Sequence, residues 1–260
     1  MSDNFSSQNH RKKRFKGLSI NRMIPNMLTL LALSAGLTAI RFALDRQWEF
    51  AVLAIVVAAI LDALDGRIAR LLKGSSKFGA ELDSLSDFVC FGVSPGLILY
   101  LWTMQEAGKF GWVLVMLFSI CCGLRLARFN VMLEDPDAPV WKNRFFIGVP
   151  APMGGALVLL PMVFSFQISD IYFRQPWISG VFLVVIASMM VSTIPTYSFK
   201  SLKISRQWVL PTMLITVGII VSIINAPWVS LSLMGCAYIT TIPLSYRAHK
   251  KLTKTSIEKI

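Results

Sequence analysis

Long apolar segments separated by short polar ones occupy almost the whole chain. At about 1.5 Å per residue, roughly 20 helical residues cross a hydrocarbon layer of about 30 Å, and the apolar segments are of this order of length. The pattern therefore predicts an all-α membrane protein, a polytopic bundle of about eight transmembrane helices. The predicted spans are 25–44, 48–72, 79–101, 110–131, a fifth that follows the irregular segment 143–152 and ends near 166, 177–196, 209–224 and 228–243.

The polar ends of the chain set the predicted domain limits. Residues 1–24 form a basic tail, residues 25–246 a single transmembrane catalytic domain, and residues 247–260 a second basic tail. Pro25 is expected in the first turn of the first span, because proline is tolerated there. The third span contains Gly92, Pro95 and Gly96, and these residues predict a kink or a close helix contact.

The second predicted span changes character halfway along, where acidic and basic residues replace apolar ones. In a helix, Asp62, Asp65, Gly66 and Ala69 are related by steps of three and four, so they share one face with Arg70 at its edge. Ionisable groups within a membrane span usually mark a functional site, because exposing them to lipid costs free energy. A structural alternative, in which Asp62 and Asp65 pair with neighbouring arginines to hold helices together, explains one pair better than several aspartates.

In the next polar stretch, too, the spacing of the acidic residues places them on one face of a helix. Gly79, Asp83 and Asp87 recur every four residues, and the short basic loop 73–77 joins this stretch to the first one. The two helices can therefore face each other with two aspartates on each.

Four carboxylates gathered in one place repel each other unless cations lie between them. All-oxygen ligation suits Mg²⁺ or Mn²⁺, and four carboxylates are enough for a pair of ions about 3.5–4 Å apart, the arrangement used for displacement at phosphorus. The sequence therefore predicts a site for two Mg²⁺ or Mn²⁺ ions, with Arg70 facing phosphate oxygens.

Composition agrees with a membrane protein. The 260 residues are 55% hydrophobic and 15% charged, with a mean hydropathy of +0.61. The four cysteines lie in apolar segments without a CxxC pair, which indicates small buried residues. The histidines, His10 and His249, both lie in the polar tails, which excludes a buried histidine base.

The net charge of +12 is explained by topology rather than by nucleic-acid binding. With the N-terminus in the cytosol, nearly all lysines and arginines fall on the cytosolic side of the predicted spans. The basic residues on the outer side are Arg41, Arg46, Lys109 and Arg174. Both termini and the aspartate site are therefore expected to face the cytosol, with membrane lipids and not nucleic acid as partners.

The two polar stretches together resemble the CDP-alcohol phosphotransferase family. Its signature D-x2-D-G-x2-A-R-x8-G-x3-D-x3-D is matched at every specified position from Asp62 to Asp87. The resemblance implies transfer of a phosphatidyl group from CDP-diacylglycerol to a hydroxyl, with release of CMP. It implies that Asp62, Asp65, Asp83 and Asp87 bind metal and that Asp87 also acts as the catalytic base.

The resemblance also implies contacts to CDP-diacylglycerol. It places Gly66, Ala69 and Gly79 against the nucleotide and gives Arg70 and Ser76 phosphate or nucleotide contacts. Asn26, in the run 24–29 at the start of the first span, lies near the nucleotide lipid in the family. Two structural alternatives stay open, namely that Asn26 only caps its helix and that Gly66 is small for helix packing.

Further runs at 78–87, 92–95, 124–130 and 146–152 resemble the membrane-integral phosphatidylserine synthases within that family, which implies L-serine as acceptor and a homodimer. Arg125 and Arg128 share a helix face and could bind the serine carboxylate, with Asn130 reading its ammonium or carboxylate. Alternatively, the arginines only set orientation and contact anionic lipid.

Other functions also account for part of the pattern. The acceptor could instead be glycerol 3-phosphate, an inositol phosphate or choline. A divalent-cation transporter accounts for the aspartates but not for the glycine, alanine and arginine fixed beside them, and a structural scaffold explains less. The expected location is a bacterial inner membrane.

Overall fold

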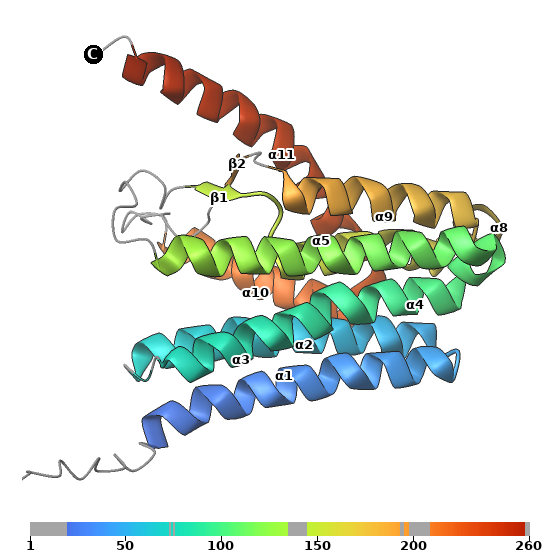
Figure 1. The fold of residues 1–260 in the computed structure, drawn as a ribbon, viewed down its shortest axis with the longest axis horizontal. Helices are drawn as coiled ribbons and strands as arrows, with labels where there is room; N and C mark the ends of the chain where they lie inside the picture. Colours follow the sequence, from blue (N-terminus) through green and yellow to red (C-terminus); the bar gives the residue numbers. More distant parts are fainter. Residues whose placement is uncertain are drawn as a thin grey trace, which may run out of the picture.

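The computed structural model describes residues 20–72, 74, 76–134, 145–192, 195–197 and 209–257. Most of the predicted N-terminal tail and part of the loop 73–77 lie outside these ranges. The described chain is a bundle of helices with one short strand pair (Figure 1). The helices are α1 (Ile20–Leu44), α2 (Trp48–Leu71), α3 (Lys77–Asp87), η1 (Phe88–Val93), α4 (Ser94–Trp102), η2 (Met104–Ala107), α5 (Gly108–Glu134), α6 (Ala151–Val158), α7 (Leu160–Ser165), α8 (Asp170–Phe173), α9 (Pro176–Val191), α10 (Val209–Asn225) and α11 (Pro227–Ile257).

The helical membrane architecture agrees with the prediction. Three helical segments, Met23–Leu44, Lys77–Trp102 and Met104–Met132, are long and apolar enough to cross a membrane. The second predicted span is also one continuous helix, α2, although acidic side chains interrupt its apolar character. The fifth predicted span is divided at Leu159 into α6 and α7.

The structure differs from the prediction at three further places. Strands β1 (Phe145–Ile147) and β2 (Pro195–Tyr197) pair antiparallel, with Phe146 opposite Thr196, a short element that the prediction did not include in the all-α protein. Helix α11 extends to Ile257, through most of the predicted C-terminal tail. Pro25 lies inside α1 rather than in its first turn, because the helix already begins at Ile20.

Helices α1 and α2 form a closely packed hairpin. The turn between them contains Arg46 with a positive φ of 58°. Ala39 and Ala43 of α1 and Ala51 and Ala58 of α2 are fully buried. Such small side chains let membrane helices approach closely, where dispersion contacts stabilise the pair.

Helix α3 continues without a break through η1 into α4, so that residues 77–102 form one rod beside α1 (Figure 1). The element η1 is a π-helix that begins directly after Asp87. A Cβ placed on Gly36 of α1 would lie 2.6 Å from Sγ of Cys90, and one on Gly92 would lie 3.0 Å from Sγ of Cys122 on α5. These glycines therefore let the rod contact both neighbours, and the predicted close contact at Gly92 is confirmed.

Helix α5 packs between the rod and α9 (Figure 1). Its buried side chains include Val115, Phe118 and Cys122, which contribute to the core with Phe91 of η1. The last turns of α5 lie beside α3, where Asn130 contacts Ser84 next to Asp83.

Candidate functional site

Helices α2 and α3 bring three of the four motif aspartates together. Carboxylate oxygens of Asp62, Asp83 and Asp87 all lie within 4.8 Å of one another, and all three residues are partly buried. Three carboxylates at this spacing destabilise one another unless a cation is shared between them. The predicted approach of the two acidic faces is therefore present in the structure.

The carboxylate oxygens of this cluster are suited to bind a hard divalent ion. Oδ1 of Asp87 is buried and has no hydrogen-bond partner among the described residues. A buried carboxylate oxygen that lacks a partner is costly, and an ion bound at the cluster would satisfy it. Within the described ranges the one ion pair joins Arg174 to Asp170, so the alternative in which the motif aspartates only pair with arginines gains no support.

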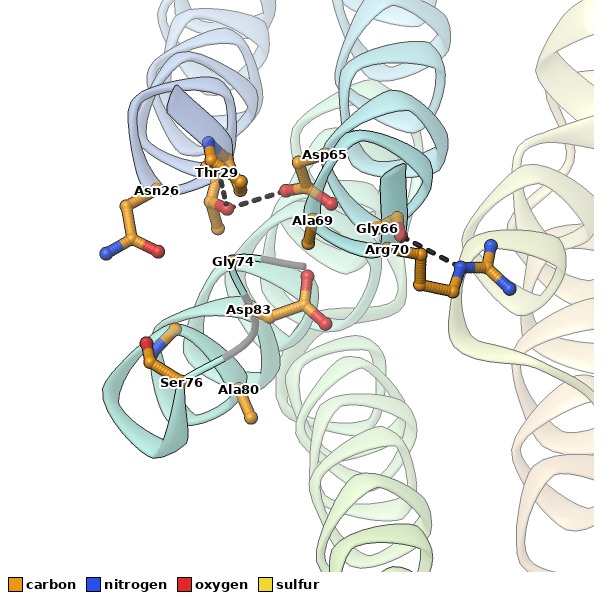
Figure 2. A pocket seen from close by; sticks show the side chains of 12 residues that line it. Asn26, Thr29, Asp65, Gly66, Ala69, Arg70, Gly74, Ser76, Ala80 and Asp83 are labelled. Atoms are coloured by element: carbon orange, nitrogen blue, oxygen red, sulfur yellow. Dashed lines mark hydrogen bonds between the residues drawn. The ribbon is translucent and has the colours of Figure 1, made fainter. Parts of the chain in front are cut away.

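Asp65 lies beside this cluster and is held by a different contact. The hydroxyl of Thr29 on α1 donates a hydrogen bond of 2.6 Å to Oδ2 of Asp65 (Figure 2). Both side chains are buried, with 4% of Thr29 and 3% of Asp65 exposed. Sequence reasoning missed Thr29, because the span also contains Asn26, Ser34 and Thr38 and nothing in the sequence marks this threonine among them.

A cavity of about 380 Å³ opens beside Asp65 and Asp83 (Figure 2). Its wall combines carboxylates, a guanidinium, small residues and polar side chains. All six residues predicted to contact the nucleotide lipid belong to it. The lining residues are Pro25, Asn26, Thr29, Asp65, Gly66, Ala69, Arg70, Gly74, Ser76, Gly79, Ala80 and Asp83.

Local geometry decides between the alternatives for two of these residues. Asn26 is not a helix cap, because α1 begins six residues earlier. Its Oδ1 would lie 2.9 Å from a Cβ on Gly79, so the side chain closes the cavity against α3. A Cβ on Gly66 would meet no heavy atom within 4 Å, so helix packing does not require a glycine there.

Two further contacts shape the cavity. Ser76 caps α3, since its hydroxyl accepts a hydrogen bond of 3.0 Å from the backbone N–H of Gly79. Arg70 Nε donates to the backbone oxygen of Gly66 at 3.0 Å, which places the arginine along the wall (Figure 2). A capped helix start and a guanidinium are both suited to anionic oxygens.

The three predicted acceptor residues on α5 make different contacts. Arg125 interacts electrostatically with Asp87 and Asp62, and its guanidinium carbon lies 5.6 Å from the centre of the Phe129 ring. Asn130 Nδ2 donates to the hydroxyl of Ser84 at 3.0 Å. Arg128 Nη1 donates to the backbone oxygen of Val191 at 2.8 Å and thereby binds the end of α9. Of these three residues, Arg125 is the one whose positive charge acts on the clustered aspartates.

Comparisons with known proteins agree with the geometry. The family model for CDP-alcohol phosphatidyltransferase matches residues 22–185, and a second model, CDP-alcohol phosphatidyltransferase 2, matches residues 207–243. A CDP-diacylglycerol–serine O-phosphatidyltransferase of Mycobacterium tuberculosis is 34% identical over 233 residues, covering 90% of this chain and 81% of the relative.

Relatives with the same name occur in other bacteria. One from Helicobacter pylori is 35% identical over 181 residues, covering 70% of this chain and 74% of its own. One from Bacillus subtilis is 37% identical over 143 residues, covering 55% of this chain and 77% of its own. The chain therefore belongs to the CDP-alcohol phosphatidyltransferase family.

Proposed function

We propose that this protein is a membrane phosphatidyltransferase that transfers the phosphatidyl group of CDP-diacylglycerol to the hydroxyl of L-serine, giving phosphatidylserine and CMP. The observation that carries the proposal is the cluster of Asp62, Asp83 and Asp87 beside a cavity lined by all six expected donor-binding residues. The names of the relatives support serine as the acceptor.

The aspartates are assigned to metal binding. Asp62, Asp65, Asp83 and Asp87 would hold Mg²⁺ or Mn²⁺, as one or two ions, and the partnerless oxygen of Asp87 supports this assignment. When bound there, a divalent cation supplies charge neutralisation for the pyrophosphate and the departing CMP.

The cavity is assigned to the nucleotide end of the donor. Gly66, Ala69 and Gly79 leave room for the cytidine nucleotide, while Arg70 and Ser76 bind phosphate oxygens and Asn26 closes the wall. The open space beside Gly66 supports this assignment, because no protein atom occupies it.

Asp87 is assigned as the catalytic base. Its carboxylate accepts the proton of the serine hydroxyl while the hydroxyl oxygen attacks the phosphorus of the phosphatidyl group and the bond to CMP breaks. General-base help of this kind is worth about 10²- to 10⁴-fold in rate.

Arg125, Arg128 and Asn130 are assigned to the acceptor. Arg125 interacts with Asp87, so a carboxylate bound by its guanidinium would lie near the base. A guanidinium has five N–H donors, so the bond from Arg128 to Val191 is compatible with a second partner. Asn130, bonded to Ser84 one residue after Asp83, completes the set.

The finer topology forms part of the proposal. We place residues 25–246 in a single transmembrane catalytic domain of about eight spans, with both termini and the cavity on the cytosolic side of a bacterial inner membrane. The protein would act as a homodimer. The charge distribution between the predicted spans supports this orientation.

The test is reconstitution into vesicles containing CDP-diacylglycerol with Mg²⁺ or Mn²⁺ and a panel of labelled alcohols. We expect release of CMP and formation of lipid product with L-serine well above glycerol 3-phosphate, inositol phosphate or choline, and no turnover with a chelator. Failure to release CMP with any alcohol would overturn the proposal. Preference for another alcohol would change the acceptor, and Mn²⁺ uptake into sealed vesicles without turnover would indicate a transporter.

A further inference from the structure

Thr29 connects the first helix to both halves of the acidic motif. Its side chain donates to Asp65 on α2 at 2.6 Å, and its backbone oxygen accepts a hydrogen bond of 3.3 Å from the hydroxyl of Ser86 on α3. Thr29, Asp65 and Ser86 are all buried. A single residue of α1 therefore contacts the two helices on whose separation the site depends.

The hydroxyl of Thr29 has two acceptors within reach but one proton. The backbone oxygen of Pro25 lies at 3.1 Å and Oδ2 of Asp65 at 2.6 Å. A hydroxyl donates one hydrogen bond, and bonds to a carboxylate are shorter and stronger than those to a neutral carbonyl. The proton therefore goes to Asp65.

This bond fixes the direction of the Asp65 carboxylate. One oxygen is bound to α1, and the other points away from Thr29 toward the part of the cavity lined by Gly66 and Ala69 (Figure 2). The main chain of Thr29 is bonded in turn to Ser86 of α3, so the hydroxyl that contacts Asp65 belongs to a residue held through both its side chain and its backbone. The carboxylate is thus held in one orientation by a residue outside the motif.

We infer that Thr29 is a positioning residue for Asp65, which sets the orientation in which that carboxylate meets a divalent cation. The inference rests on the proposed function for the presence of the cation. Replacing a residue that orients a metal ligand through a hydrogen bond typically lowers metal affinity or activity by about 10- to 100-fold.

The chain contains a matched control on the same helix. The hydroxyl of Thr38 donates to the backbone oxygen of Ser34 at 2.7 Å, four residues earlier, and Thr38 is exposed. Thr38→Val and Thr29→Val each remove one hydroxyl from α1. Only the second change removes a bond to Asp65.

The experiment measures Mn²⁺ binding by the detergent-purified full chain, using the electron paramagnetic resonance signal of free Mn²⁺, together with turnover and thermal unfolding. We expect Thr29→Val to weaken Mn²⁺ binding by about 10- to 100-fold. Thr29→Ser, which keeps the hydroxyl, should recover most of the loss. Thr38→Val should bind Mn²⁺ as the unchanged protein does.

A double substitution shows whether Thr29 acts through Asp65. In an Asp65→Asn background, Thr29→Val should cause little additional loss of Mn²⁺ affinity, because the carboxylate that it orients is already gone. The inference would be overturned if Thr29→Val lowered Mn²⁺ affinity equally in the unchanged protein and in Asp65→Asn. Normal Mn²⁺ binding by Thr29→Val would also overturn it. A loss shared by Thr29→Val and Thr29→Ser and accompanied by an equal fall in Tm would show a packing role and also overturn it.

The outcomes separate this inference from the proposed function. If the unchanged protein binds Mn²⁺ and releases CMP while Thr29→Val matches it in both, the positioning role fails and the function stands. If the unchanged protein neither binds Mn²⁺ nor releases CMP, the proposed function itself fails.

Discussion

Asn130 on α5 donates a hydrogen bond of 3.0 Å to the hydroxyl of Ser84 on α3, next to the cluster aspartate Asp83. The contact joins the helix that carries the proposed acceptor residues to the helix that carries two proposed metal ligands. Asn130 could therefore serve the acceptor directly or only fix α3, and the two roles are separable.

Replacement of Asn130 by alanine distinguishes these roles, with Ser84→Ala as its matched control. Both changes remove the same bond, but only Asn130→Ala removes the amide. We expect Asn130→Ala to raise the KM for serine several-fold more than Ser84→Ala, with the KM for CDP-diacylglycerol little changed. Equal effects of the two substitutions would assign Asn130 to holding α3.

Asp87→Asn tests the catalytic base. The amide keeps the size of the side chain but cannot accept the serine proton, so we expect kcat to fall about 10²- to 10⁴-fold. Donor binding should be retained better than activity. The change also removes one of three neighbouring negative charges, so the metal-free protein should unfold at a higher temperature than the unchanged one.

The measurements are single-turnover release of CMP, binding of labelled CDP-diacylglycerol and thermal unfolding in chelator. Asp170→Asn is a suitable control, because Asp170 at the start of α8 pairs with Arg174 just after that helix, in a different part of the described chain. Undiminished turnover by Asp87→Asn would remove Asp87 from the role of base.

Gly66→Ala should separate stability from donor binding. The added methyl meets no atom of the protein within 4 Å, and alanine in a helix is more favourable than glycine by about 0.5–1 kcal/mol. We therefore expect stability to be kept or raised. The methyl should occupy space in the cavity and raise the KM for CDP-diacylglycerol.

The control is Gly218→Ala on α10, where an added Cβ also meets nothing within 4 Å. Both substitutions should change Tm in the same direction, while only Gly66→Ala should change the KM for the donor. An unchanged donor KM in Gly66→Ala would show that the nucleotide does not approach this residue.

The two arginines of α5 should differ in their effects. Arg125→Ala removes the guanidinium that interacts with Asp87, so the KM for serine should rise, and Tm in chelator should fall because the carboxylates lose a nearby positive charge. Arg128→Ala also removes the bond to Val191 at the end of α9, so it should lower stability by about 0.5–3 kcal/mol as well. Serine titrations and thermal unfolding of both variants provide the test, and unchanged serine KM values in both would exclude them from the acceptor site.

The acidic faces were predictable because they depend on local periodicity. Steps of three and four residues bring Asp62 and Asp65 to one face of α2 and Asp83 and Asp87 to one face of α3 whatever else the chain does. A short connection then leaves few ways to place the helices. This is why Asp62, Asp83 and Asp87 meet as the periodicity predicts, with Asp65 beside them. The cavity residues came from the family resemblance, and their roles stay predictions.

The role of Thr29 depends on tertiary contacts and was not predictable from its position. Threonines in helices commonly donate to the carbonyl four residues earlier, as Thr38 does, and only the packing of α1 on α2 gives Thr29 a better acceptor. The pairing of β1 with β2 likewise joins segments that are distant in the sequence, whereas the division at Leu159 follows locally from Pro161, which has no backbone N–H to continue the helix.

The rod formed by residues 77–102 has a mechanical consequence. Its tight contact with α1, where Gly36 meets Cys90, can act as a fulcrum. At the helical rise of about 1.5 Å per residue, Asp87 lies roughly 4.5 Å from Cys90 along the rod, while Trp102 lies roughly 18 Å away on the other side. A tilt about this contact therefore displaces Asp87 by only about a quarter as much as Trp102, so Asp87 nearly keeps its position when the bilayer moves the distal half of the rod.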